Sequence, residues 1–151
     1  MAESKKIASI LLCLACAAIA AGLLTSCASM GQTDKDKKAL DSSVETFNRS
    51  FRWEDFDTAA LFINPETKLQ FWNEVDKFKG KIHVIDFQIR DLDWQEKRPI
   101  ATAIVYFQYY RTASPSIQTI TFEQKWYYVE KEKVWRLGKS GFDAITARND
   151  L

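Results

Sequence analysis

One stretch decides the fold: Ile100-Ala101-Thr102-Ala103-Ile104-Val105-Tyr106-Phe107-Gln108-Tyr109-Tyr110-Arg111. Its side chains fall into two alternating rows, as they do on the two faces of a strand. The wholly apolar row is predicted to face a core: Ala101, Ala103, Val105, Phe107 and Tyr109. The other row also holds too many apolar residues for a bare solvent face. We therefore expect it to make a protein contact, with Ile104, Tyr106 and Tyr110 as the interface candidates.

Strand patterns flank this stretch on both sides. Upstream, from Lys81 to about Arg90, apolar and polar residues alternate, and Val84 beside Ile85 breaks the alternation as a β-bulge does. Downstream, a strand is predicted over about 118–129, followed by a charged hairpin loop at 130–133 and a short strand at 134–137. The predicted sheet thus has about four consecutive antiparallel strands.

Helical patterns precede the strands. A helix is predicted from about Lys37 to Phe51, where Leu40, Val44 and Phe47 recur on one face, and a shorter one over about 55–62. Asn64 and Pro65 then read as the N-cap and first residue of a third helix, which ends at Gly80. Its predicted inward residues are Leu69, Trp72 and Val75. Helices followed by antiparallel strands indicate an α+β fold.

The whole domain is predicted to span residues 37–138, with 139–151 as a loose tail that Phe142 partly anchors. The segment Phe51 to Phe62 and the ending Gln124 to Leu137, with its charged turn and Trp135-Arg136-Leu137, resemble the nuclear transport factor 2-like (SnoaL-like) superfamily. That resemblance implies a cystatin-like cone: helices packed on a curved sheet, with space between them. Members often pair through the sheet, but their functions are unrelated to one another.

The N-terminus has the pattern of a secretory signal peptide over residues 1–26. Lys5 and Lys6 precede an apolar run from Ile7 to Leu24. Leu24-Thr25-Ser26-Cys27 resembles the lipobox of bacterial lipoproteins. The resemblance implies cleavage before Cys27 and a lipid on its thiol, which would anchor the protein in the membrane. The alternative is an uncleaved membrane helix, for which 18 residues are near the lower limit.

Residues 27–36 are predicted to be a flexible tether between lipid and domain. Ala28 and Ser29 follow the cysteine without an aspartate. By resemblance to enterobacterial sorting, we expect the outer membrane, with the domain facing the periplasm. Loss of residues 1–26 would remove two of 21 basic residues and one of 20 acidic residues, leaving 19 of each. This balance gives no electrostatic support for a nucleic-acid partner.

Candidates for chemistry are few. His83 is the single histidine, and no thiol remains beyond Cys27, so we expect no metal and no cofactor. Gly138-Lys139-Ser140 lacks the earlier glycine of a phosphate-binding loop. Asp86, Asp91, Tyr106 and Tyr110 supply the residue types of a ketosteroid-isomerase-like site, but Asp86 lies on the polar side of its strand pattern.

Gln124 is predicted to lie in the inward row of its strand, between Phe122 and Trp126. A buried amide needs a partner, either within a closed core or in an open cone. The second reading makes a pocket lined by Gln124, Trp126, Tyr109 and His83, suited to a small apolar ligand. We favour a noncatalytic binding domain that contacts an envelope protein, a second copy or such a ligand. The alternative is a small-pocket enzyme, isomerase- or dehydratase-like, on the same fold.

Overall fold

The computed structural model describes residues 27–95 and 99–147 and places side chains within 34–95 and 99–145. The predicted signal peptide, residues 1–26, lies outside the described residues. The chain divides into two compact units, Met1–Lys37 and Lys38–Leu151. The described part of the first unit is helical. The second unit holds the whole four-stranded sheet.

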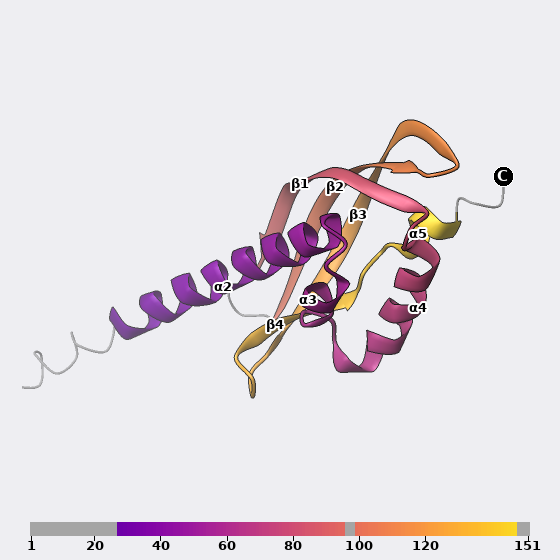
Figure 1. Ribbon diagram of the computed structural model, residues 1–151. Helices are drawn as coiled ribbons and strands as arrows, with labels where there is room; N and C mark the ends of the chain where they lie inside the picture. The colour runs from indigo at the N-terminus through magenta and orange to yellow at the C-terminus, as the bar shows by residue number, and fades with distance from the viewer. Residues whose placement is uncertain (1–26, 96–98, 148–151) are drawn as a thin grey trace, which may run out of the picture. The chain divides into compact units, whose positions relative to one another are not determined.

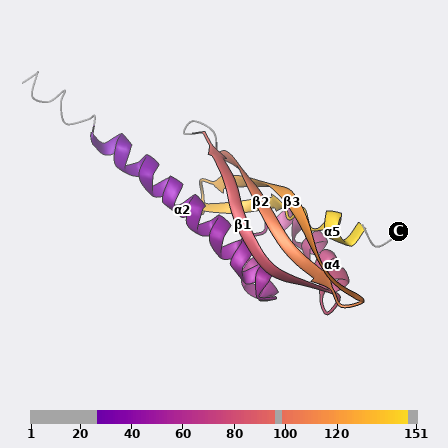
Figure 2. The ribbon, with the colours of Figure 1, turned by 90° about the horizontal axis from the view of Figure 1, so that it is seen from above.

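The elements follow one another as helices, strands and a last short helix. They are α2 (Cys27–Arg52), α3 (Phe56–Ala60), the 3-10 turn η1 (Pro65–Thr67), α4 (Lys68–Phe78), β1 (Ile82–Trp94), β2 (Ile100–Arg111), β3 (Ser114–Val129), β4 (Val134–Lys139) and α5 (Asp143–Ala147). The strands form one open antiparallel sheet in the order β1-β2-β3-β4, and the helices of this unit lie on one side of it (Figures 1 and 2). The predicted α+β architecture is confirmed.

Strand β2 spans Ile100–Arg111, the same range that the alternating pattern predicted. All five residues of its inward row are at most 2% exposed. They face the inward row of β3, where Phe122, Gln124 and Trp126 are also buried. The register of β1 against β2 shifts between Val84 and Asp86, which confirms the predicted bulge, and shifts again between Ile89 and Asp91. Strand β1 extends beyond its predicted end to Trp94, because after the second bulge its side chains again alternate between the two faces of the sheet.

Helix α2 begins at Cys27, ten residues before the predicted start, so residues 27–36, predicted as a flexible tether, are helical. Apolar periodicity could not find this start, because residues 34–39 are exposed or half-buried and have no buried stripe. Among the described helices, none has both the length and the apolarity needed to span a membrane.

The predicted inward face of the third helix was partly wrong. Leu69 is 75% exposed, whereas Phe71, Val75 and Phe78 are buried and Trp72 packs against their edge. Asn64 does cap the segment, since its Oδ1 accepts a hydrogen bond from the Glu66 N–H at 3.1 Å. However, residues 65–67 form a 3-10 turn, so the α-helical stripe takes its phase from Lys68 rather than Pro65.

The predicted loose tail was wrong for residues 139–145. Strand β4 continues to Lys139, and Phe142 and Ile145 are buried in the core. The ring of Phe142 stacks on Phe51, with centroids 3.5 Å apart and planes within 1°. Gly141 has φ +80°, the left-handed region that glycine adopts most readily, and a side chain there would press on Phe122. Five helical residues are too few for a periodic pattern to predict.

Candidate functional site

Of the four predicted pocket residues, the fold brings only Gln124 and Trp126 together, and Gln124 meets a side chain rather than an opening. Gln124 pairs with Asn48 of α2: its Nε2 donates to Asn48 Oδ1 at 2.8 Å and its Oε1 accepts from Asn48 Nδ2 at 3.2 Å. Asn48 Nδ2 also donates to the carbonyl of Val44 at 2.8 Å. Both amides are fully buried. The partner that Gln124 required is therefore supplied by the core itself.

Trp126 follows Gln124 in the inward row of β3, whereas Tyr109 lies six residues along β2 from Ala103, the register partner of Gln124. The Tyr109 hydroxyl donates to Gln118 Oε1 at 2.8 Å. The Trp126 ring meets Phe47 edge-on at 5.9 Å between centroids. Its buried Nε1–H has no hydrogen-bond partner among the described residues. An unpaired N–H of this kind lowers stability, and it is the one unsatisfied polar atom of the predicted pocket set.

His83 lies apart from Gln124 and Trp126, beside Tyr110 on the outward side of the sheet. Their rings stack at 5.0 Å between centroids. His83 Nδ1 is 2.7 Å from Glu54 Oε1, and His83 Nε2 is 3.3 Å from Thr112 Oγ1. We call Glu54, His83 and Thr112 the clip, because they join the end of α2, the start of β1 and the β2–β3 turn.

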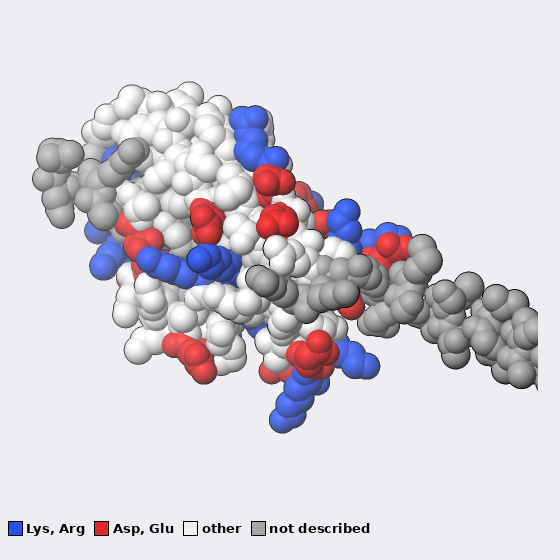
Figure 3. All heavy atoms as spheres, turned by 180° about the vertical axis from the view of Figure 1, so that it is seen from behind, with Lys and Arg blue, Asp and Glu red and all other residues white. Residues whose placement is uncertain are grey.

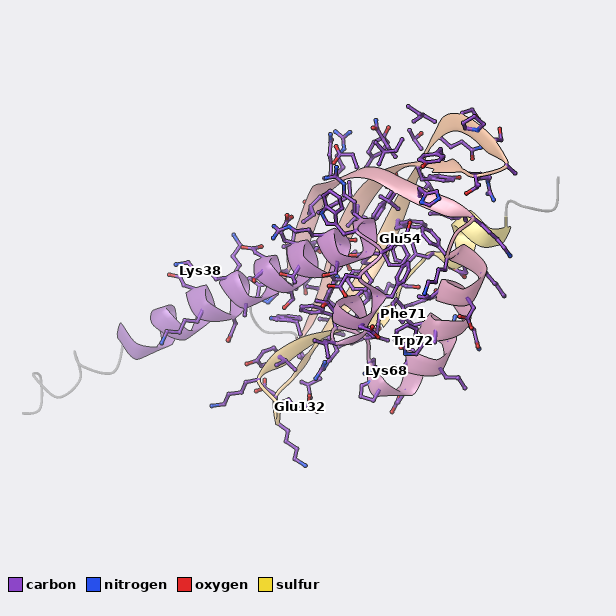
Figure 4. All side chains as sticks on the ribbon, viewed as in Figure 1. Lys38, Glu54, Lys68, Phe71, Trp72 and Glu132 are labelled. Atoms are coloured by element: carbon purple, nitrogen blue, oxygen red, sulfur yellow. The ribbon has the colours of Figure 1, made fainter. Side chains whose placement is uncertain are left out.

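Glu54 occupies an unusual backbone position at the end of α2 (Figure 4). Its φ is +57°, and the hydrogen bonds Glu54 N–H to Phe51 O and Asp55 N–H to Ser50 O form a Schellman motif around it. Glycine is the usual residue there, since an L side chain in the left-handed region costs about 1–2 kcal/mol. The residue in this unfavourable conformation is thus the one whose side chain contacts His83.

The clip has the order hydroxyl, imidazole, carboxylate that activated nucleophiles use. The hydroxyl, however, has a closer acceptor than the ring: Thr112 Oγ1 donates to the Gly80 carbonyl at 3.0 Å. Its single proton is thus directed to the backbone rather than to His83. We read the clip as a structural connection. Sequence reasoning missed Glu54 and Thr112, because neither belongs to a motif and only the fold brings them to His83.

A double-mutant cycle can measure the clip. In the His83→Ala background, Glu54→Gly should stabilise the protein by about 1 kcal/mol, because the strain at residue 54 is relieved and no bond remains to be lost. In the native background the gain should be offset by the lost Glu54–His83 bond, worth about 0.2–1 kcal/mol for half-exposed groups. Urea unfolding gives both values. Equal stabilisation in the two backgrounds would show that the bond contributes nothing.

A second polar cluster surrounds Glu74, which is 7% exposed on α4. Its carboxylate accepts hydrogen bonds from the hydroxyl of Ser140 and from Gln70 Nε2. A cavity of about 10 Å³ adjoins them, room for about one water molecule. Lys139 also borders this cavity; its hydrogen bond to Asp143, and the charge of that carboxylate, raise the pKa of Lys139. The Ser140 hydroxyl is therefore engaged by Glu74.

The residue types of an isomerase site are present but are not assembled as an inward acid–base pair. Asp86 Oδ1 lies 3.4 Å from Arg52 Nη1, and Asp91 accepts a hydrogen bond from the Leu92 N–H. The Tyr106 ring lies under the guanidinium of Arg90, 4.9 Å from its centroid. Within residues 27–95 and 99–147, no three His, Cys, Asp or Glu side chains are grouped to hold a metal ion.

The part of the sheet's outward face nearest the β2–β3 turn is uncharged on β2 and β3. Ile104, Tyr106 and Tyr110 are half-buried on the outward face. Thr119 and Thr121 continue this face on β3, and residues 112–122 contain no charged side chain. Seen from behind, the part of the molecule near the β2–β3 hairpin shows a broad area without Lys, Arg, Asp or Glu atoms (Figure 3).

A scan against protein-family models, a search of curated proteins and a search of solved structures each give no match.

Proposed function

We propose that this chain is a membrane-anchored, noncatalytic interaction domain of the bacterial envelope, and that it binds another envelope protein through the outward face of its sheet. The supporting observation is that uncharged part of β2 and β3, where Tyr106 and Tyr110 lie near Thr119 and Thr121. Ile104 lies at its border, between Asp91 of β1 and Glu123 of β3. Tyrosine is enriched at protein interfaces because it offers a large apolar area with a polar end. The partner is expected to present an uncharged surface of its own.

Two observations favour an external partner for this face. The C-terminal segment, an obvious candidate to cover it, instead buries Phe142 and Ile145 on the other side of the sheet. The sheet's helices also lie on that other side. The alternative function, a small-pocket enzyme, would need an acid–base pair facing a substrate site. Asn48 and Gln124 do not titrate, and the buried carboxylate of Glu74, hydrogen-bonded to Ser140 and Gln70, adjoins a cavity with room for about one water molecule.

Photocrosslinking in cells tests the surface. A photoreactive residue at 104, 106 or 110 should give an adduct with another envelope protein, because these side chains would be buried against it. Leu69 is the matched control, since it is an exposed apolar residue on the helical side. An adduct between two copies of the chain would identify a homodimer instead. Equal labelling at residue 69, or no adduct at any sheet position, would contradict the proposed surface.

The membrane anchor rests on Cys27, whose side chain lies outside the described ones. Replacing Cys27 by serine should abolish incorporation of labelled fatty acid and leave an uncleaved precursor, because the thiol is the predicted attachment point. One acyl chain binds a bilayer only marginally, at about 0.8 kcal/mol per buried CH₂, whereas several chains hold firmly. Membrane fractionation should place the native protein in the outer membrane; equal labelling of the serine variant would exclude the anchor.

A further inference from the structure

Strand β1 forms an open edge of the sheet. In the described part of the chain it pairs with β2 alone, and it is the outermost strand in Figure 2. Gln88, Arg90 and Asp91 on this strand are exposed. The N–H and C=O groups along such an edge are a template for another strand. The sequence of β1 indicates which strand would fit.

The exposed middle of β1 is complementary to itself. Residues 86–90 read acid, apolar, amide, apolar, base: Asp86, Phe87, Gln88, Ile89 and Arg90. If two copies of this segment run antiparallel with Gln88 opposite Gln88, then Asp86 of each copy faces Arg90 of the other. Phe87 likewise faces Ile89. Opposite charges and apolar pairs directly across two strands are the pairs that stabilise a sheet.

We propose that two copies of this chain pair antiparallel through the β1 edge, with Gln88 on the two-fold axis. A two-fold interface must be self-complementary, which this segment is. The two sheets would join into one of eight strands. The inference does not rest on the proposed function, because it concerns the edge of the sheet rather than its outward face.

The structure places the paired side chains on the appropriate faces. Asp86 and Gln88 are register partners of Gln108 and Tyr106, both in the outward row, and Arg90 stacks on Tyr106. Phe87 points to the core side, with its ring 6.1 Å from that of Phe107. The charged pairs would therefore meet on the outward side and the apolar pairs on the inward side of the new ladder.

The two bulges of β1 limit where the pairing can lie. They fall between Val84 and Asp86 and between Ile89 and Asp91, so they bracket the regular stretch 86–89. The proposed pairing uses this stretch together with Arg90, the extra residue of the second bulge. Hollows also run along the seam between α2 and this stretch, lined in part by Phe87 and Ile89, which are only half-buried. A second copy would cover these two apolar side chains further.

The same charges and bulges have an opposite reading, in which they protect the edge from pairing. Asp86 would then form an ion pair only with Arg52, whose Nη1 lies 3.4 Å from Asp86 Oδ1. That reading predicts a monomer whose edge is insensitive to the order of its charges. The two readings are separated by an experiment on the charges and on the axis residue.

Cysteine crosslinking tests the axis. In the full chain in detergent, with Cys13, Cys16 and Cys27 replaced by serine, Gln88→Cys should form a disulfide-linked dimer on mild oxidation, because residue 88 would face its own copy. Glu123→Cys, at a position that is also exposed but lies on the outward face of β3, is the matched control and should stay largely monomeric. Crosslinking at 123 but not at 88 would overturn the proposal and indicate pairing through the face.

Charge exchange tests the register in the Gln88→Cys background. Asp86→Arg places arginine opposite arginine at both symmetric positions, and Arg90→Asp does the same with acids. Each is expected to lower dimer yield about tenfold, because like charges directly opposite oppose pairing. The double variant Asp86→Arg/Arg90→Asp restores opposite charges and should restore the dimer. Equal yields in all four proteins, or no recovery in a double variant with native circular dichroism, would overturn the proposal.

Discussion

Replacing Phe142 by alanine should lower the free energy of unfolding by about 3–5 kcal/mol, the usual loss for a buried aromatic side chain. Phe142 is 1% exposed and stacks on Phe51. Its ring also lies 5.1 Å from Phe122 and 5.6 Å from Phe107, centroid to centroid. The substitution would therefore leave a cavity between α2 and the middle of the sheet.

Urea unfolding followed by circular dichroism measures this loss. Ile117→Ala is the matched control, because Ile117 is 66% exposed near the β2–β3 turn and its truncation should change stability by no more than about 0.5 kcal/mol. If Phe142→Ala were as stable as this control, the last segment would not be part of the core. A shortened chain that ends at residue 139 should fail to fold stably, because it also lacks Phe142.

Replacing Gln124 by leucine should cost about 1–3 kcal/mol, since it leaves the Asn48 Oδ1 acceptor buried without its donor. Leucine is close in size to glutamine, so the loss reports the unpaired amide rather than a cavity. At roughly 4 °C per kcal/mol for a domain of this size, the melting temperature should fall by about 4–12 °C.

The double variant Asn48→Leu/Gln124→Leu provides the control. Because it removes both partners, it should be more stable than Gln124→Leu alone, and the difference measures the coupling of the two amides. If Gln124→Leu retained its full melting temperature, the amide would not depend on Asn48. An effect on uptake of a small ligand without loss of stability would restore the pocket interpretation.

Much of the sheet was determined by local pattern. Alternation along residues 100–111 defined both faces of β2, because the side-chain period of a strand is fixed by its backbone. The paired apolar residues Val84 and Ile85 revealed a bulge for the same reason. The second bulge, at Arg90, could not be predicted. An extra charged residue on an exposed edge does not place two apolar residues side by side, so the sequence pattern does not reveal it.

Alternation also placed Gln124 inward, but it could not say which side chain would meet it. Asn48 is 76 residues away in the chain, and only the packing of α2 on β3 brings the two amides together. The clip is a similar case: Glu54 and His83 are 29 residues apart, and their contact depends on how α2 ends. Contacts of this kind arise from the tertiary structure rather than from neighbouring residues.

The sequence by itself determined the order of helices and strands as far as β4 and the two faces of β2 and β3; the anchor at Cys27 remains a prediction. Each depends on residues close together in the chain, where periodicity and composition are sufficient. The tertiary structure alone decided that Phe142 completes the core, that Leu69 faces solvent and that Gln124 is satisfied by Asn48. Their environments are set by segments distant in the chain, and a local pattern contains no information about which distant segment will pack against it.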